Sequence, residues 1–213
     1  MNTVPVKVFS TRIAPLVDGA PDFLICRAVV DTVMAVCKET LCLTTETAFR
    51  TKPYENEYDI PMPDGLDIEQ IRWAYCDGWQ LRVKTQDELA RMFMPMDWKD
   101  CDGMPLYYSF RKKNHIVFAP VPEKTYHIRL SVSANVERET DNVPELFFTD
   151  YVDCITFGAV ARLLRTAGQS FSNFQLGELY QARYEGELDG VRSDAVQDYT
   201  RNAGHVFYNG WAI

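Results

Sequence analysis

Six cysteines and three histidines are the residues of this chain best suited to metal binding or nucleophilic chemistry. No two cysteines have Cys-x-x-Cys spacing, and three of them fall in apolar stretches, where a free cysteine behaves as a small hydrophobic residue. His115 and His127 lie in expected strands, with no carboxylate or cysteine at ligand spacing. We therefore expect no metal site and no cofactor.

Two short motifs approach known ligand-binding or catalytic patterns without completing them. The segment Asp100-Cys-Asp102-Gly103 resembles part of a calcium loop, but the alignment puts Trp98 and Ser109 where carboxylates are required. The segment Gly168-Gln-Ser170 falls short of a nucleophile elbow and lies between two expected helices, whereas an elbow follows a strand. We interpret both motifs as turns and predict that the protein is not an enzyme.

Charge argues against a protein that binds nucleic acid, and composition favours an assembly protein. The 213 residues include 30 acidic and 22 basic side chains, for a net charge of −8, whereas a protein that grips phosphates needs a clustered basic face. Aromatic residues make up 13% of the chain, which favours an assembly protein because aromatic side chains supply much interface energy. No signal peptide or membrane-spanning stretch is evident, so we expect a soluble protein, made in a reducing cytoplasm and without a membrane partner.

Helical periodicity marks the two ends of the chain. A helix is expected from Pro21, with apolar residues at helical spacing from Phe23 to Leu41. Residues 150–167 are apolar on nearly every side, which predicts a buried central helix. A longer helix is expected over residues 173–203. Its apolar stripe comprises Tyr180, Tyr184, Leu188, Val191, Ala195 and Tyr199.

The middle of the chain, residues 44–136, has β character. Asp77-Gly78 and Lys113-Asn114 each predict a tight hairpin, and residues 126–132 alternate as a strand does. A short helix is expected at Gln86–Phe93. We predict an antiparallel module because its connections look too short for parallel crossovers.

These patterns predict an α+β fold in which a helical bundle, made of the N-terminal helix and two C-terminal helices, carries an inserted antiparallel β module. The whole chain, 1–213, is expected to form a single domain. Its parts are an extended or irregular N-terminal arm (1–20), the helical bundle (21–43 and 144–203), the β insert (44–136) and a C-terminal docking tail (204–213).

Acidic charge is concentrated in the C-terminal third. Residues 1–136 carry 18 acidic and 16 basic side chains, whereas residues 137–213 carry 12 and 6. A solvated helix face explains this pattern in the simplest way. An acidic surface that repels a polyanion is the functional alternative.

The end of the chain is the main candidate for partner binding, because apolar residues gather where polar residues are usual. Such a cluster must dock either on its own domain or on a partner. The basic hairpin tip at Phe110–Lys113 is a second charged feature, either a solubilising loop or a contact for nucleic acid or an acidic protein. The tail candidates are His205, Val206, Phe207, Tyr208, Trp211 and Ile213.

The order of several weak structural motifs resembles the head-to-tail adaptor (head-completion) proteins of tailed bacteriophages, over roughly residues 20–170. The motifs are Val36-Cys-Lys-Glu-Thr40, Thr44-Thr-Glu-Thr47, Tyr58-Asp-Ile-Pro61, the hairpin at Asp77-Gly78, Phe118-Ala-Pro-Val-Pro122, Val143-Pro-Glu-Leu146 and Gly158-Ala-Val-Ala-Arg-Leu-Leu164.

The resemblance implies a non-enzymatic virion protein of the head–tail neck, made in the host cytoplasm. It implies a ring, usually of twelve copies, that lies beneath the portal, extends the DNA channel without sequence-specific binding and presents a surface to a tail or nozzle protein. On this basis we expect helices around 150–203 to make the ring contacts and residues 205–213 to dock on the portal. The β module is expected to face outward or toward the tail.

A different function remains open from the residues themselves. Trp73, Trp79 and Trp98 could stack on sugars if they are exposed, which would make the middle of the chain a carbohydrate- or receptor-binding β module of a tail protein. Packing inside the fold is the commoner role of tryptophan. A hydrolase with an unrecognised site is a third and weaker alternative.

Overall fold

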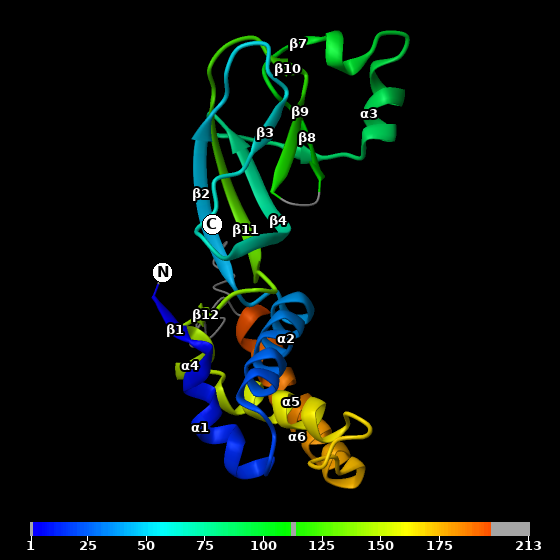
Figure 1. Cartoon of the computed structure of the whole chain (residues 1–213). Helices are drawn as coiled ribbons and strands as arrows, with labels where there is room; N and C mark the ends of the chain where they lie inside the picture. Colours follow the sequence, from blue (N-terminus) through cyan, green and yellow to red (C-terminus); the bar gives the residue numbers. More distant parts are fainter. Residues whose placement is uncertain (1, 112–113, 197–213) are drawn as a thin grey trace, which may run out of the picture.

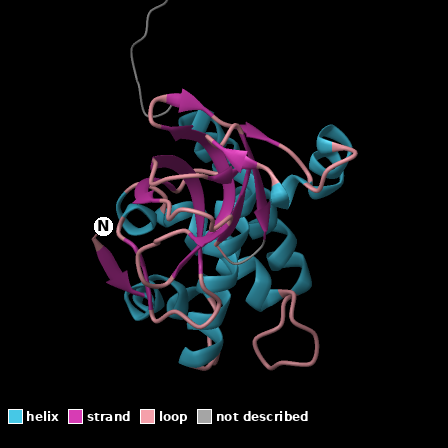
Figure 2. Ribbon diagram, turned by 90° about the horizontal axis from the view of Figure 1, so that it is seen from above, coloured by secondary structure: helices cyan, strands magenta, loops and turns pink. Residues whose placement is uncertain are grey.

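The computed structural model describes residues 2–111 and 114–196 and shows a mixed α+β protein, as predicted. Helices gather at one end of the molecule and the longer strands at the other (Figure 1). Seen from above, the strands lie over the helices and a short helix stands to one side (Figure 2).

The N-terminal segment differs from the extended or irregular arm expected for residues 1–20. After strand β1 (Thr3–Pro5) it forms helical turns η1 (Val6–Phe9), α1 (Ser10–Ile13) and η2 (Ala14–Leu16). Four apolar side chains at helical spacing enter the core, and Pro5 and Pro15 conceal this period in the sequence. These side chains are Val6, Phe9, Ile13 and Val17.

Helix α2 (Asp22–Thr40) confirms the first predicted helix. Pro21 is its extended N-cap residue rather than its first helical residue, and Leu41 closes it in the left-handed conformation. The buried face is wider than the predicted stripe, but Phe23, which was expected on that stripe, is 69% exposed. Phe23 therefore contributes little to the core.

The C-terminal helices are α4 (Leu146–Thr149), α5 (Val152–Leu164) and α6 (Phe174–Val196). Helix α5 is buried on most sides, as predicted, but ends at Leu164 rather than at residue 167. Helix α6 buries Tyr184, Leu188 and Val191 of its predicted stripe, and residues 197–203 lie outside the described part of the chain. Helices α2, α5 and α6 contact one another and share one hydrophobic core with the N-terminal turns.

Two four-stranded sheets pack face to face in the middle of the chain. The first has the order β2-β11-β4-β5, and the second has the order β3-β9-β8-β6. Their shared core contains Ile71 of β4, Leu130 of β11 and Phe118 of β9. The first sheet comprises β2 (Thr44–Arg50), β4 (Leu66–Cys76), β5 (Trp79–Gln80) and β11 (His127–Val136). The second comprises β3 (Glu57–Asp59), β6 (Arg82–Val83), β8 (Tyr107–Arg111) and β9 (His115–Ala119).

Both predicted hairpins are present: β4 pairs with β5 around Asp77-Gly78, and β8 pairs with β9. The expectation of a wholly antiparallel module was wrong for two short pairs, because β6 runs parallel to β8 and β7 (Asp102–Gly103) runs parallel to β10 (Val121–Pro122). The segment 84–106 is long enough for the first crossover, and residues 104–120 join the second pair.

Strand β11 connects the two halves of the molecule. It pairs with both β2 and β4 and continues to Val136, four residues beyond the predicted strand end. Ala134 and Val136 belong to the helical core, whereas Leu130 belongs to the core between the sheets. The Asn135 amide donates to Met34 O of α2 at 3.2 Å, which ties the helices to the sheet. A small antiparallel pair of β1 with β12 (Asn142–Pro144) closes the junction.

Candidate functional site

Four of the six cysteines, Cys37, Cys42, Cys76 and Cys154, are buried, and Cys26 and Cys101 are partly buried. The hydrogen bond between Cys37 and Cys42 lowers the pKa of Cys42. A hydrogen bond with Cys42 and then burial raise the pKa of Cys37 well above its ordinary value. Burial also raises the pKa of Cys76 and of Cys154, each to about 12. A protonated thiol is a poor nucleophile and a poor metal ligand, so the thiols of Cys37, Cys76 and Cys154 are unreactive near neutral pH.

The remaining chemical motifs serve local structure. Residues 168–170 lie in a turn, as predicted, whereas residues 100–103 span the end of a 3-10 helix and strand β7, so their interpretation as a turn was wrong. Ser172 Oγ accepts from Gln169 N at 3.1 Å and contacts Thr166 O, within the turn that joins α5 to α6. His115 Nδ1 contacts the Asp59 carboxylate across the β3–β9 pair. Over residues 2–111 and 114–196, no three His, Cys, Asp or Glu side chains are grouped so that they could hold a metal ion. No described helix is long and apolar enough to cross a membrane.

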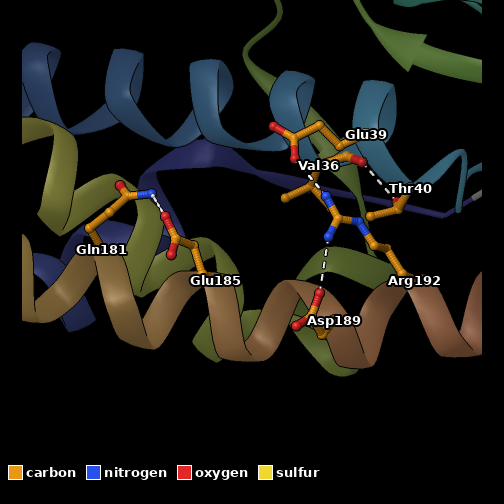
Figure 3. Close-up of polar contacts among 7 residues, drawn as sticks. All are labelled: Val36, Glu39, Thr40, Gln181, Glu185, Asp189 and Arg192. Atoms are coloured by element: carbon orange, nitrogen blue, oxygen red, sulfur yellow. Dashed lines mark hydrogen bonds and ion pairs between the residues drawn. The ribbon is translucent and has the colours of Figure 1, made fainter.

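Helix α6 presents an acidic surface that is partly fixed by ion pairs. It carries five acidic and two basic residues. Arg192 bridges Asp189 at 3.0 Å and Glu39 of α2 at 3.2 Å, and Gln181 donates to Glu185 at 2.8 Å (Figure 3). Of these contacts, the Arg192–Glu39 ion pair crosses between helices and joins the C-terminal half of α6 to the end of α2. The last described residue, Val196, follows one turn later and is 86% exposed.

An apolar limb, residues 83–106, projects from the β module. It contains α3 (Gln86–Phe93) and η3 (Trp98–Asp100), and both views place α3 beside the strands (Figures 1 and 2). Leu89 and Trp98 anchor the limb in a small separate core with Val117 and Ala119 of β9. The helix was predicted from the sequence, but its exposed apolar residues were not, although three methionines around one proline were a visible signal. The exposed residues are Val83, Met92, Met94, Met96 and Leu106.

A capping box begins helix α3. Thr85 Oγ1 accepts from Glu88 N at 3.2 Å, and the Glu88 carboxylate accepts from Thr85 N at 2.8 Å and from Lys84 Nζ at 3.0 Å. The Thr85 backbone hydrogen bond, followed by the Lys84 contact, lowers the pKa of Glu88 to about 2.

We expect helix α3 to lose stability as the pH falls from about 4.5 to about 2. A carboxyl whose pKa is lowered on folding stabilises the protein above its unfolded pKa, and this contribution disappears as the folded group takes up a proton. The protection factors of the amides of residues 88–93, measured by NMR hydrogen exchange, should fall over this range. Glu88→Gln, which keeps a capping oxygen, should flatten that dependence. A Glu88 carboxyl that titrates at its ordinary pKa contradicts the assignment.

The outer face of the first sheet holds an aromatic and cationic pocket of about 380 Å³. Trp73 and Tyr75 lie two residues apart on β4, with ring centroids 5.3 Å apart at 65°. Arg129 is paired with Tyr75 in the register of β11 and β4. His127 lies two residues before Arg129 on β11, and therefore on the same face. Gly78 completes the lining.

The three tryptophans of the sugar-binding alternative therefore differ in position. Trp98 is 4% exposed and packs inside the limb, so it cannot be a sugar platform. Trp79 is 70% exposed but does not line the pocket, and Trp73 is half-buried and does line it. Tyr75, Arg129 and His127 were not singled out as partners of Trp73, because only the strand register brings them together.

Two predicted interaction features fall wholly or partly outside the described residues. The tail candidates His205–Ile213 all lie beyond Val196. At the basic hairpin tip, residues 112 and 113 are likewise outside the described residues, and Asn114 follows them. Asn114 has φ +63°, its backbone O accepts from Ile60 N, and its Oδ1 accepts from Ile68 N at 2.8 Å.

A family model for the SU10 adaptor protein matches residues 7–206. The chain belongs to the SU10 adaptor protein family. The match is wider than the span of roughly 20–170 over which the sequence motifs resembled head-to-tail adaptors, and it includes α6. A search of curated proteins found no match.

Membership of the SU10 adaptor family makes this protein a structural component of a phage virion and confirms the resemblance to phage head-to-tail adaptors. It implies portal and tail proteins as partners. The family match ends at Val206, so Phe207, Tyr208, Trp211 and Ile213 lie beyond it. Proteins of this family are structural, so interaction surfaces are the first candidates for a functional site.

Proposed function

We propose that this SU10 adaptor forms a ring beneath the portal in the head–tail neck, extends the DNA channel and offers an attachment surface for a tail or nozzle protein. The match to the adaptor family over residues 7–206 is the observation that carries the proposal. A ring of about twelve copies needs a heterologous interface, in which two different surfaces of each subunit meet and the rotation closes.

The division of the molecule supports different roles for its two ends. We assign the ring contacts to the helical bundle, chiefly to α5 and α6, because these helices and α2 share one large core. A rigid helical end can keep its interface geometry constant around a closed ring. The β module then faces outward or toward the tail, where its apolar limb is available to the next component.

The acidic surface of α6 is compatible with a wall along which DNA moves without binding. Its five carboxylates against two cations repel phosphates, which is the opposite of the basic face that a DNA-binding protein needs. DNA would then pass through the channel without sequence-specific contacts.

The proposal is tested by mixing the purified protein with the portal protein of its own genome and imaging the mixture by electron cryomicroscopy. We expect a second ring stacked on the portal, with the helices of neighbouring copies in contact. A separate assay of DNA packaging confirms that the portal is competent. A competent portal with no second ring overturns the proposal, and a ring joined through the β modules overturns only the assignment of the interface.

A further inference from the structure

We propose that the pocket between Trp73 and Arg129 on the outer face of the first sheet binds an acidic saccharide. The inference goes beyond the connector role and does not rest on ring formation. The side chains that line this pocket lie at the surface, because the opposite face of the same strands fills the core between the sheets.

The aromatic part of the pocket is built for a ring-shaped ligand. Trp73 and Tyr75 stand on one face of β4 and contact each other edge to face, so each restricts the rotation of the other. Both side chains are half-buried, and they keep apolar surface next to a cavity. The C–H groups on one side of a pyranose ring pack against such aromatic surfaces.

The polar part of the pocket favours a negative charge on the ligand. Arg129 is 60% exposed, and its Nη2 lies 3.9 Å from the Glu46 carboxylate, which is too long for a hydrogen bond. Its guanidinium therefore keeps donors for another carboxylate. One oxygen of the nearby Asp77 carboxylate, Oδ1, accepts a hydrogen bond from His127 N at 2.9 Å. Arg50, which pairs with His127 in the β2–β11 register, adds a second cation to this face.

The pocket size fits one or two sugar rings better than a nucleic-acid strand. Its volume of about 380 Å³ lies at the lower end of the range for small-molecule sites. Single-stranded nucleic acid needs a basic groove that follows the backbone over several nucleotides, and the next pocket along this face includes Glu46. A uronic acid combines the features that these side chains recognise: an apolar ring face, hydroxyl groups and one carboxylate.

The test uses the full chain on an array of bacterial surface saccharides that carries uronic-acid-containing and neutral glycans. Trigalacturonate and its uncharged methyl ester are then compared by calorimetric titration. We expect binding to acidic members of the array and to trigalacturonate, with at least about fivefold weaker binding of the ester. Absence of signal from all acidic glycans overturns the proposal, and equal binding of the ester overturns its anionic part.

Matched variants locate the site. Trp73→Ala should weaken binding about tenfold and Arg129→Gln about fivefold, whereas Trp79→Ala and Arg82→Gln, which change exposed residues outside the pocket, should leave it unchanged. Arg129→Gln keeps the test valid if Trp73→Ala fails to fold. Equal losses in the control variants, or Trp73-dependent binding of a thymidine pentanucleotide without saccharide binding, overturn the assignment.

Discussion

Replacing Gly158 with alanine is expected to destabilise the protein by about 1–3 kcal/mol. A Cβ atom at this position of α5 would lie 2.5 Å from Thr32 Cγ2 of α2 and 2.8 Å from Tyr184 Cδ2 of α6. Both neighbours are buried, and Thr32 is further held because its Oγ1 donates to Ala28 O at 2.7 Å. Neither side chain can move aside cheaply, so the three helices must separate. Urea unfolding monitored by circular dichroism measures the loss.

The same substitution at two other glycines is the matched control. A Cβ atom at Gly186 or Gly190 of α6 would meet nothing within 4 Å, and both residues are helical. Gly186→Ala and Gly190→Ala should therefore stabilise the protein by about 0.5–1 kcal/mol each, through helix propensity alone. If Gly158→Ala proves as stable as these variants, the close contact of α2, α5 and α6 is wrong.

The sequence predicted those parts of the fold that depend on neighbouring residues. Each of these parts rests on a few adjacent residues with strong local preferences. They are the start of α2 next to Pro21, the capped helix at Gln86–Phe93 and the hairpin at Asp77-Gly78. The N-terminal turns were missed because Phe9 and Ile13 gain their helical conformation by entering a core built by distant segments. The helical spacing of these residues is present in the sequence, but Pro5 and Pro15 conceal it and the contacts that favour it are distant.

The candidate surfaces were less predictable than the fold because they depend on the register and on burial. Two β-bulge irregularities interrupt the pairing of β11 with β4, so the position of Arg129 beside Tyr75 cannot be counted from the sequence. The three tryptophans look alike in sequence, yet the structure gives them three different exposures. The parallel pairing of β6 with β8 likewise depends on the limb being long enough for a crossover, and only its folded path shows this.

Deleting residues 205–213 is expected to abolish binding to the portal without unfolding the protein. This prediction rests on the proposed connector role and on the composition of the segment, which contains Phe207, Tyr208 and Trp211. Buried aromatic anchors often contribute about 2 kcal/mol or more each at interfaces. The loss of three such anchors should therefore lower the affinity for the portal by several orders of magnitude. Sedimentation of the adaptor with portal rings measures the binding.

The described part of the fold explains why stability should survive the deletion. The buried residues of the helical core lie between Val6 and Val191, and Arg192 holds the end of α6 on α2 through Glu39. The melting temperature should therefore change by less than about 2 °C. Point variants separate anchoring from mere length: Phe207→Ala and Trp211→Ala should each weaken portal binding at least about thirtyfold, whereas Asn209→Ala should not. Unchanged portal binding by the truncated chain would show that the adaptor docks through another surface, with the apolar limb around Met92 and Met94 as the next region to vary.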